Sequence, residues 1–142
     1  MVKRRKILVI DDAPDSRKIL HQVLTTAHFS VQEASTGVDG LAMAQKDPPD
    51  IIVLDLMMPG QDGIETYRAL KESSSTRDVP IIFLTALSGG SPLTPEGLEL
   101  MARTKYGQEM NLDEDCVILG KSLNPKRLVR EVEKALEKVK KG

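Results

Sequence analysis

Four short apolar runs constrain the fold more than any other feature of the sequence. They are Ile7–Ile10, Ile51–Leu54, Ile81–Leu84 and Val117–Leu119, and each is continuous rather than alternating. Continuous runs rich in β-branched residues are typical of strands buried on both faces of a parallel sheet. Phe29–Ala34 alternates only in part, which indicates an edge strand or a half-covered one.

Helical patterns separate these runs. Pro14 is well placed in the first turn of one helix, and a second helix must end before Pro48–Pro49. Ile64–Leu70 marks a third. Thr94–Pro95 and Asn124–Pro125 each place a capping residue before a proline at the first helical position. The alternation of strands and helices predicts an α/β fold with a doubly wound, five-stranded parallel sheet.

Length and composition narrow the range of functions. A chain of 142 residues fits one domain, so we expect a single domain over 1–142, with a core of about 5–140 and no output domain. The net charge of −1 gives no field that favours nucleic acid. The four apolar residues after Lys3–Lys6 are too few for a signal peptide or a membrane span, so we expect no membrane partner and a cytoplasmic protein. The single Cys116 excludes an internal disulfide and a cysteine-based zinc site, and we expect it to be a buried, inert thiol.

Polar residues follow the strong strands at the point where each ends. Asp11 and Asp12 follow the first, Asp55 the third, Thr85 the fourth, and Lys121 comes shortly after the last. In open α/β sheets the functional crevice lies outside the carboxyl ends of the strands, so these side chains are expected to converge. Clustered carboxylates require a cation, and their oxygen ligands favour Mg²⁺. A carboxylate that remains available can attack phosphorus and form an aspartyl phosphate.

Four segments together carry a family resemblance. They are VIDDAPDSRKIL, DIIVLDLMMPGQDGIETYRALK, PIIFLTA and GKSLNPKRL. With these segments the chain resembles the receiver domains of two-component response regulators, of the chemotaxis-regulator type, which have a flavodoxin-like (βα)5 fold. The resemblance runs from Lys6 to about Ala86 and resumes at Val117. Any one of these motifs would be a weak signal, whereas the set is a strong one.

The resemblance implies a role for each residue of the site. Asp55 would be the phosphoacceptor, Thr85 the switch hydroxyl and Lys121 the lysine that contacts the phosphoryl group. Asp55 would also bind Mg²⁺, together with Asp12 and the backbone carbonyl of Met57. Asp11 would act on the same ion through water.

The resemblance also implies partners. The phosphoryl donor would be a sensor histidine kinase or a phosphotransfer protein. Phosphorylation would switch the surface of the fourth helix, the last strand and the last helix, so that it binds an unidentified downstream protein, and a homodimer is possible. The chain would not be an enzyme beyond self-phosphotransfer and slow self-dephosphorylation. Dephosphorylation is expected to be slow because Met57 and Leu87, two residues after Asp55 and Thr85, cannot orient a water by hydrogen bonding.

Three departures from the family pattern keep other hypotheses open. Ile118 stands where the family usually has an aromatic residue, Ser122 replaces the usual proline, and Ser88–Asp115 is longer than the family norm. They motivate an alternative function, a phosphorylation-independent interaction module on the same fold. A small phosphatase is a weaker alternative, because no carboxylate lies two residues after Asp55 to act as acid and base. The pair Asp11 and Asp12 also fits a simpler role as the cap of the first helix.

Overall fold

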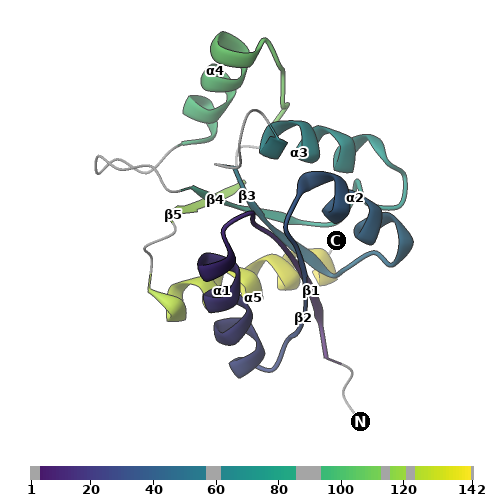
Figure 1. Ribbon diagram of the computed structural model, residues 1–142, viewed down its shortest axis with the longest axis vertical. Coiled ribbons are helices and arrows are strands. Elements are labelled where there is room, and N and C mark those ends of the chain that lie inside the picture. The colour runs from purple at the N-terminus through teal and green to yellow at the C-terminus, as the bar shows by residue number, and fades with distance from the viewer. Residues whose placement is uncertain (1–3, 57–61, 86–93, 113–115, 121–123, 142) are drawn as a thin grey trace.

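The sheet has the predicted doubly wound topology. The computed structural model describes residues 4–56, 62–85, 94–112, 116–120 and 124–141. Their elements, in chain order, are β1 (Lys6–Ile10), α1 (Pro14–Thr26), β2 (Ser30–Ala34), α2 (Gly37–Lys46), β3 (Ile51–Asp55), α3 (Asp62–Glu72), β4 (Ile81–Thr85), α4 (Pro95–Tyr106), β5 (Val117–Gly120) and α5 (Pro125–Lys141). The strands are parallel, in the order β2-β1-β3-β4-β5 (Figure 1). The fold class predicted from the apolar runs is therefore confirmed.

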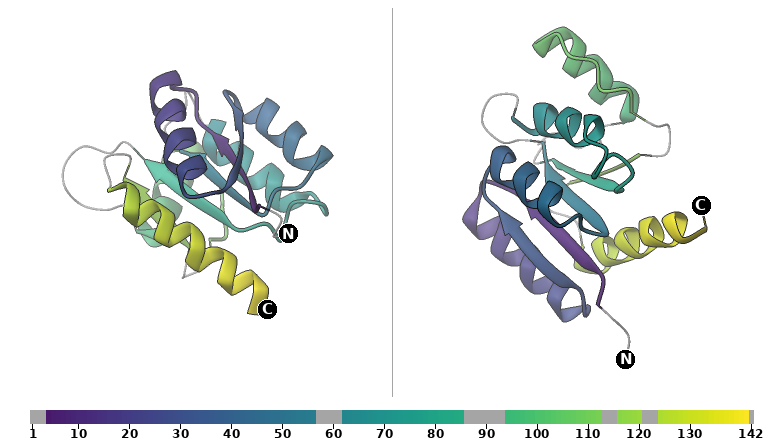
Figure 2. Two further views of the ribbon diagram at one scale, coloured as in Figure 1. Left: turned by 90° about the horizontal axis from the view of Figure 1, so that it is seen from below. Right: turned by 90° about the vertical axis from the view of Figure 1, so that its right-hand side faces the viewer.

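Each central strand buries side chains on both faces of the sheet. Leu8, Ile52 and Phe83 belong to one core cluster, which contains side chains of α2, α3 and α4. Ile7 and Val53 belong to the other, which contains side chains of α1 and α5. Burial on both sides explains why these strands read as continuous apolar runs. β2 is an edge strand with exposed positions, as its partial alternation predicted. Figure 2 shows the two helical layers on either side of the sheet.

α4 lies farther from the sheet than the other helices. Thr94 caps its first turn by accepting a hydrogen bond from Gly97 N, with Pro95 at the first helical position, as predicted. Leu98 and Ala102 of α4 join the core cluster beside α3, and the helix extends beyond α3 in Figure 1. α4 therefore contributes to the same core cluster as α3.

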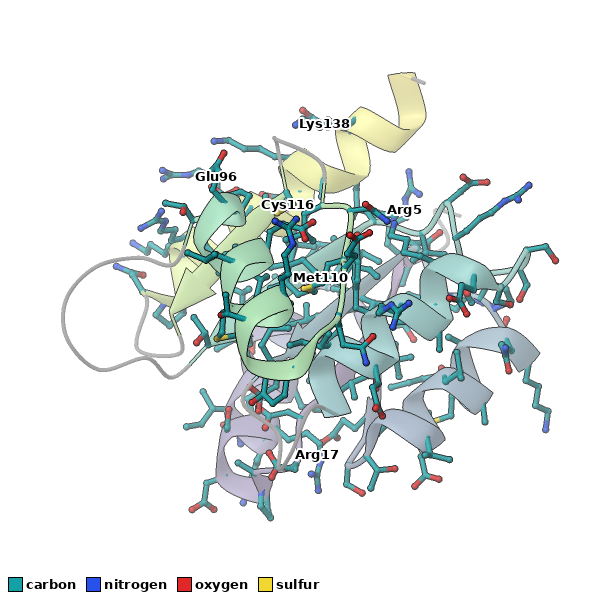
Figure 3. The ribbon with its side chains drawn as sticks, turned by 90° about the horizontal axis from the view of Figure 1, so that it is seen from above. Arg5, Arg17, Glu96, Met110, Cys116 and Lys138 are labelled. Atoms are coloured by element: carbon teal, nitrogen blue, oxygen red, sulfur yellow. The ribbon has the colours of Figure 1, made fainter. Side chains whose placement is uncertain are left out.

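The segment after α4 also contributes to this core cluster. Gly107 ends the helix in the left-handed conformation, at φ 64°. The carboxylate of Glu99 accepts hydrogen bonds from the backbone N–H groups of Met110 (3.2 Å) and Leu112 (2.6 Å), which fixes the segment against the helix. Met110 is buried in the core cluster and lies beside α4 in Figure 3.

Two expectations need correction. Cys116 is half-buried rather than buried, because it lies just before β5, the strand at the edge of the sheet. Neither Asp11 nor Asp12 is the N-cap of α1, because that position is Ala13, which provides no side-chain cap. Asp11 instead accepts a hydrogen bond from Ala13 N, so it stabilises the turn that leads into the helix.

Candidate functional site

Three carboxylates meet at the carboxyl ends of β1 and β3. Asp11 and Asp12 follow β1, and Asp55 is the last residue of β3, which is hydrogen-bonded to β1. One carboxylate oxygen from each residue lies within 4.8 Å of the others. Asp11 is 0% exposed and Asp55 is 1% exposed, whereas Asp12 is half-buried. The structure therefore brings together the three aspartates that the sequence singled out.

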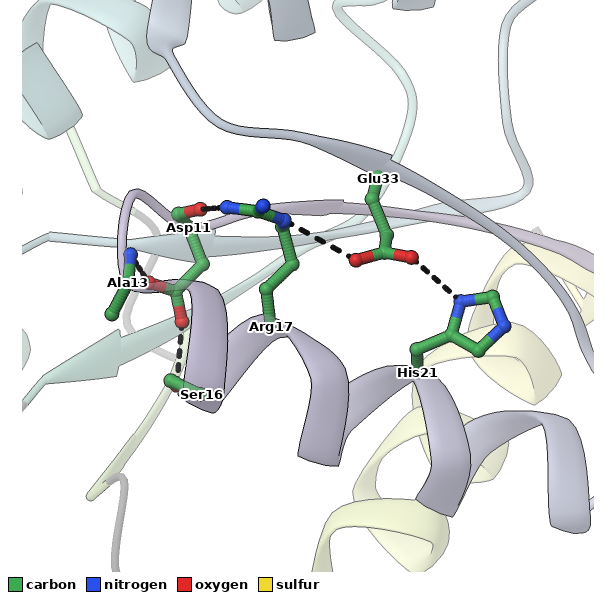
Figure 4. Close-up of polar contacts among 6 residues, drawn as sticks. All are labelled: Asp11, Ala13, Ser16, Arg17, His21 and Glu33. Carbon is green, nitrogen blue, oxygen red and sulfur yellow. Dashed lines mark hydrogen bonds and ion pairs between the residues drawn. The ribbon is translucent and has the colours of Figure 1, made fainter.

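Short local contacts hold Asp11 in place (Figure 4). Its Oδ1 accepts a hydrogen bond from Ala13 N at 2.9 Å, and its Oδ2 accepts one from the hydroxyl of Ser16 at 2.6 Å. The backbone of Asp11 is fixed as well, since its N–H donates to Ala34 O at 3.1 Å and its carbonyl accepts from Arg17 Nη1 at 2.9 Å. The carboxylate is thus oriented by its own turn and by the first turns of α1.

The cluster has the chemistry of a site for a hard cation. Carboxylates this close repel one another, and burial strengthens the repulsion by removing water. A divalent cation with oxygen ligands relieves it, and Mg²⁺ commonly binds one or two carboxylates together with phosphate oxygens. The half-buried Asp12 leaves one side of the cluster within reach of solvent. These donors therefore fit a magnesium ion.

Thr85 lies on the next strand of the same edge. It ends β4, where its neighbour Leu84 pairs with Asp55. Thr85 is 5% exposed, and within the described part of the chain its Oγ1 has no hydrogen-bond partner. A buried hydroxyl in that state carries an energetic cost and is available to bind an added oxygen ligand.

A glycine lets α3 begin close to the end of β3. A Cβ built on Gly63 would lie 2.8 Å from the backbone O of Asp55 and from the Cα of Leu56. Side chains do not tolerate such distances, so only glycine permits this approach. Gly63 therefore lets the first turn of α3 pack against the end of the strand that carries the phosphoacceptor candidate.

The structure leaves two predicted site residues unplaced and adds others. Lys121 and Met57 both lie outside the described residues, so their predicted roles remain predictions. Ser16, Arg17 and Glu33 contact the Asp11 turn directly or through one another, and sequence patterns did not select them. For Ser16 and Arg17, the sequence indicated only a position in the first turn of the helix that follows the acidic pair. It gave no indication for Glu33.

Known proteins match this chain in sequence and in structure. The family model for the response regulator receiver domain matches residues 7–105. The response regulator PleD of Caulobacter vibrioides is 45% identical over 84 residues, which cover 59% of this chain and 18% of PleD. The probable transcriptional regulator ycf27 of Porphyridium aerugineum is 36% identical over 141 residues, which cover 99% of this chain and 52% of the relative. The chain thus spans only a part of the curated relatives that it matches.

The structural comparison agrees. The chemotaxis protein CheY4 of Vibrio cholerae superposes with a TM-score of 0.73 at 25% identity, over 94% of this chain and 99% of CheY4. The signal receiver domain of a signal transduction histidine kinase from Syntrophus aciditrophicus gives a TM-score of 0.74 at 25% identity, over 97% of this chain and 94% of the other. No helix among the described residues is long and apolar enough to cross a membrane. The acidic cluster, the strand order and these matches together show that the chain belongs to the response regulator receiver domains of two-component systems.

Proposed function

We propose that Asp55 accepts a phosphoryl group in a reaction that requires Mg²⁺ bound at the acidic cluster. The observation that carries the proposal is the approach of three carboxylates to within 4.8 Å, two of them fully buried. Bringing three carboxylates this close is unfavourable because like charges repel, and a bound cation would relieve that repulsion. Asp11, Asp12 and Asp55 would hold the ion, and the carbonyl of Met57 completes the set that the family resemblance implies.

The reaction transfers a phosphoryl group from a histidine of the donor protein to the carboxylate of Asp55. A carboxylate oxygen of Asp55 forms a bond to phosphorus while the P–N bond of a donor phosphohistidine breaks and its electron pair returns to the imidazole nitrogen. When bound, Mg²⁺ offsets the negative charge on the phosphoryl oxygens. Thr85 Oγ1, which is buried and has no described partner, can then donate its hydrogen bond to a phosphoryl oxygen. Lys121 would add a positive charge on the same group.

A groove beside the cluster offers a surface for the donor protein. It has a volume of about 300 Å³ and lies between α1 and α5, where it is lined by Ser16, Ile19, Leu20, Val23, Leu84, Pro125 and Leu128. Ser16 binds Asp11 directly, so the groove begins at the site, and Ile19 is 59% exposed. An exposed apolar side chain next to an apolar groove favours a helical partner. We therefore place the histidine kinase or phosphotransfer protein on this face.

Mass spectrometry of the intact protein tests the acceptor. Wild type and Asp55→Asn are incubated with acetyl phosphate, with Mg²⁺ or with EDTA. We expect one phosphoryl adduct on wild type with Mg²⁺, and none on the variant or with EDTA. After removal of acetyl phosphate, the adduct should persist far longer than seconds, because Met57 and Leu87 cannot orient a water. An adduct of equal yield on Asp55→Asn would exclude Asp55 as the acceptor.

A second function is favoured by one observation. Ile118 pairs with Phe83 on the neighbouring strand β4, and it packs against the core cluster that contains side chains of α3 and α4. The family usually has an aromatic switch residue at the position of Ile118. A branched aliphatic side chain in this position cannot act as a rotating aromatic ring. The alternative is an interaction module whose binding does not depend on phosphorylation. It predicts that a partner isolated with wild type binds Asp55→Asn with equal affinity, and that EDTA does not release it.

A further inference from the structure

A chain of three polar side chains leads from the acidic cluster to the surface of α1 (Figure 4). Arg17 Nη1 donates to the backbone carbonyl of Asp11 at 2.9 Å, and Arg17 Nε lies 3.2 Å from Glu33 Oε1. The other carboxylate oxygen of Glu33 lies 2.9 Å from His21 Nδ1. Arg17 and His21 are on α1, whereas Glu33 is on β2. This series of contacts therefore links the turn after β1 to α1 and to β2.

The contacts of Arg17 are partly buried, so they should contribute more than ion pairs on the open surface. The side chain of Arg17 is 21% exposed and that of Glu33 is 33% exposed, while His21 is 40% exposed. Fully exposed ion pairs contribute little, but partly buried pairs in a fixed geometry are screened less by water and salt. The guanidinium is planar with several donors, so it can bind a carbonyl and a carboxylate at the same time.

We propose that Arg17 is a positioning residue for the Mg²⁺ site. It fixes the backbone at Asp11, and so keeps the carboxylates of Asp11 and Asp12 in the arrangement that binds the cation. The inference rests on the proposed function, because it takes the acidic cluster to be the Mg²⁺ site. Groups that orient metal ligands without touching the metal commonly change metal affinity by about 10- to 100-fold when they are removed.

Glu33 has a complementary task. With three carboxylates nearby, a guanidinium that is not held elsewhere would be drawn toward them and would compete with the cation. Glu33 engages the Nε edge of Arg17 and leaves Nη1 on the carbonyl of Asp11. It also balances the positive charge of Arg17, so that the pair as a whole does not repel Mg²⁺. His21 contacts the far oxygen of Glu33 and is the most exposed member, so its contribution should be the smallest.

Titration calorimetry with Mg²⁺ alone tests this role. The key variant is the double substitution Arg17→Met with Glu33→Gln, which keeps the net charge of the pair and removes only the contacts. We expect the Kd for Mg²⁺ to rise about 10-fold. Glu33→Gln alone should raise it at least as much, because it releases the charged guanidinium. Arg17→Lys should recover only part of the affinity, because one ammonium group cannot span the carbonyl and the carboxylate as the fork does.

A matched control separates positioning from general stability. Asp47→Asn makes the same kind of change in an ion pair at the opposite edge of the sheet, where Lys6 Nζ lies 2.7 Å from Asp47 Oδ1. It should leave the Kd for Mg²⁺ unchanged. Thermal unfolding without Mg²⁺ identifies any variant that fails to fold. If the double variant does not fold, the Kd of Glu33→Gln is used instead, because Glu33 is partly exposed.

The outcomes are distinct. A 10-fold weaker Kd in the double variant, with Asp47→Asn unchanged, supports the positioning role. A double variant that folds and binds Mg²⁺ within twofold of wild type overturns that role but leaves the proposed function intact. A wild type that neither binds Mg²⁺ nor accepts a phosphoryl group overturns both.

Discussion

At the scale of single residues, the burial of the Asp11 carboxylate has a free-energy cost that its hydrogen bonds must offset. Asp11 is 0% exposed, and a buried carboxylate without donors would cost several kcal/mol. Its side chain accepts hydrogen bonds from the backbone N–H of Ala13 and from the hydroxyl of Ser16. The Ser16 contact, at 2.6 Å, has the length of a hydrogen bond to a charged acceptor. In the absence of a cation these donors help to keep the carboxylate inside the fold.

Ser16→Ala removes one of these donors and leaves the carboxylate buried. We expect the variant to lose about 1.5–3 kcal/mol of unfolding free energy in Mg²⁺-free buffer, the usual contribution of a hydrogen bond to a charged group. Saturating Mg²⁺ should narrow the difference, because the cation then compensates the same charge. Urea denaturation with EDTA and with Mg²⁺ measures both values. An equal loss under the two conditions would show that Ser16 does not act through the Asp11 charge.

Residues at the ends of strands were the predictable part of the site. Asp11, Asp55 and Thr85 each follow an apolar run, and parallel strands place their carboxyl ends along one edge, so their convergence follows from the order of the elements. The contact of Arg17 with Glu33 does not follow in this way. It depends on the register in which β2 pairs with β1 and on how α1 packs against both, and neither is encoded by spacing along the chain.

Among the elements, α4 shows the limit of sequence patterns. Thr94 and Pro95 signalled its start correctly, because capping is decided by neighbouring residues. The packing of the segment after α4 was not predicted: Met110 enters the core, and the carboxylate of Glu99 accepts hydrogen bonds from the backbone of Met110 and Leu112. These contacts span eleven or more residues and leave no periodic signal.

The groove between α1 and α5 is the proposed docking surface for the phosphoryl donor. Ile19→Glu places a charge on the exposed apolar position beside the groove, 59% exposed in the native chain. The substitution should slow phosphotransfer from a cognate kinase by 10-fold or more, because it opposes an apolar contact that costs about 1–3 kcal/mol to lose. Phosphorylation by acetyl phosphate should not change, because Ile19 is not part of the acidic cluster. Phosphotransfer assays with both donors measure the two rates.

Leu100→Glu is the matched control. Leu100 is also 59% exposed, but it lies on α4 rather than α1. If the donor binds between α1 and α5, this variant should accept phosphoryl groups from the kinase at the wild-type rate. Equal slowing by both substitutions would contradict docking on the groove and would point to a general effect of added negative charge.

In the molecule as a whole, the proposed functional residues and the least favourable polar groups both lie at the carboxyl ends of the strands. Both core clusters are apolar and well covered, whereas the carboxyl edge gathers three carboxylates and an unsatisfied threonine hydroxyl among the described residues. Sites of this kind are commonly less stable than their inactive variants, because the arrangement that binds a ligand is unfavourable without it. The global stability of the chain should therefore depend on the charge of this cluster and on Mg²⁺.

Asp55→Asn tests this dependence. The substitution nearly preserves the shape of the side chain and removes one of three mutually repelling charges, one that is 1% exposed. In Mg²⁺-free buffer we expect the variant to be more stable than wild type by about 1–2 kcal/mol, a common gain from one stabilising substitution, because it removes repulsion among the carboxylates. Mg²⁺ at about 100 times its Kd should stabilise wild type by about 2.7 kcal/mol, because it binds only the folded state. The variant has one ligand fewer and should gain less.

The order of stabilities should therefore reverse when Mg²⁺ is added, and urea denaturation of both proteins with and without the ion reveals it. Asp12→Asn provides a second case, with a smaller gain expected because Asp12 is only half-buried and its charge is better solvated. If Asp55→Asn were less stable than wild type in EDTA, repulsion among the carboxylates would not control the stability of the cluster. Hydrogen bonds to the carboxylates would then outweigh that repulsion. The need for a cation would have to be shown by the Mg²⁺ dependence of phosphorylation instead.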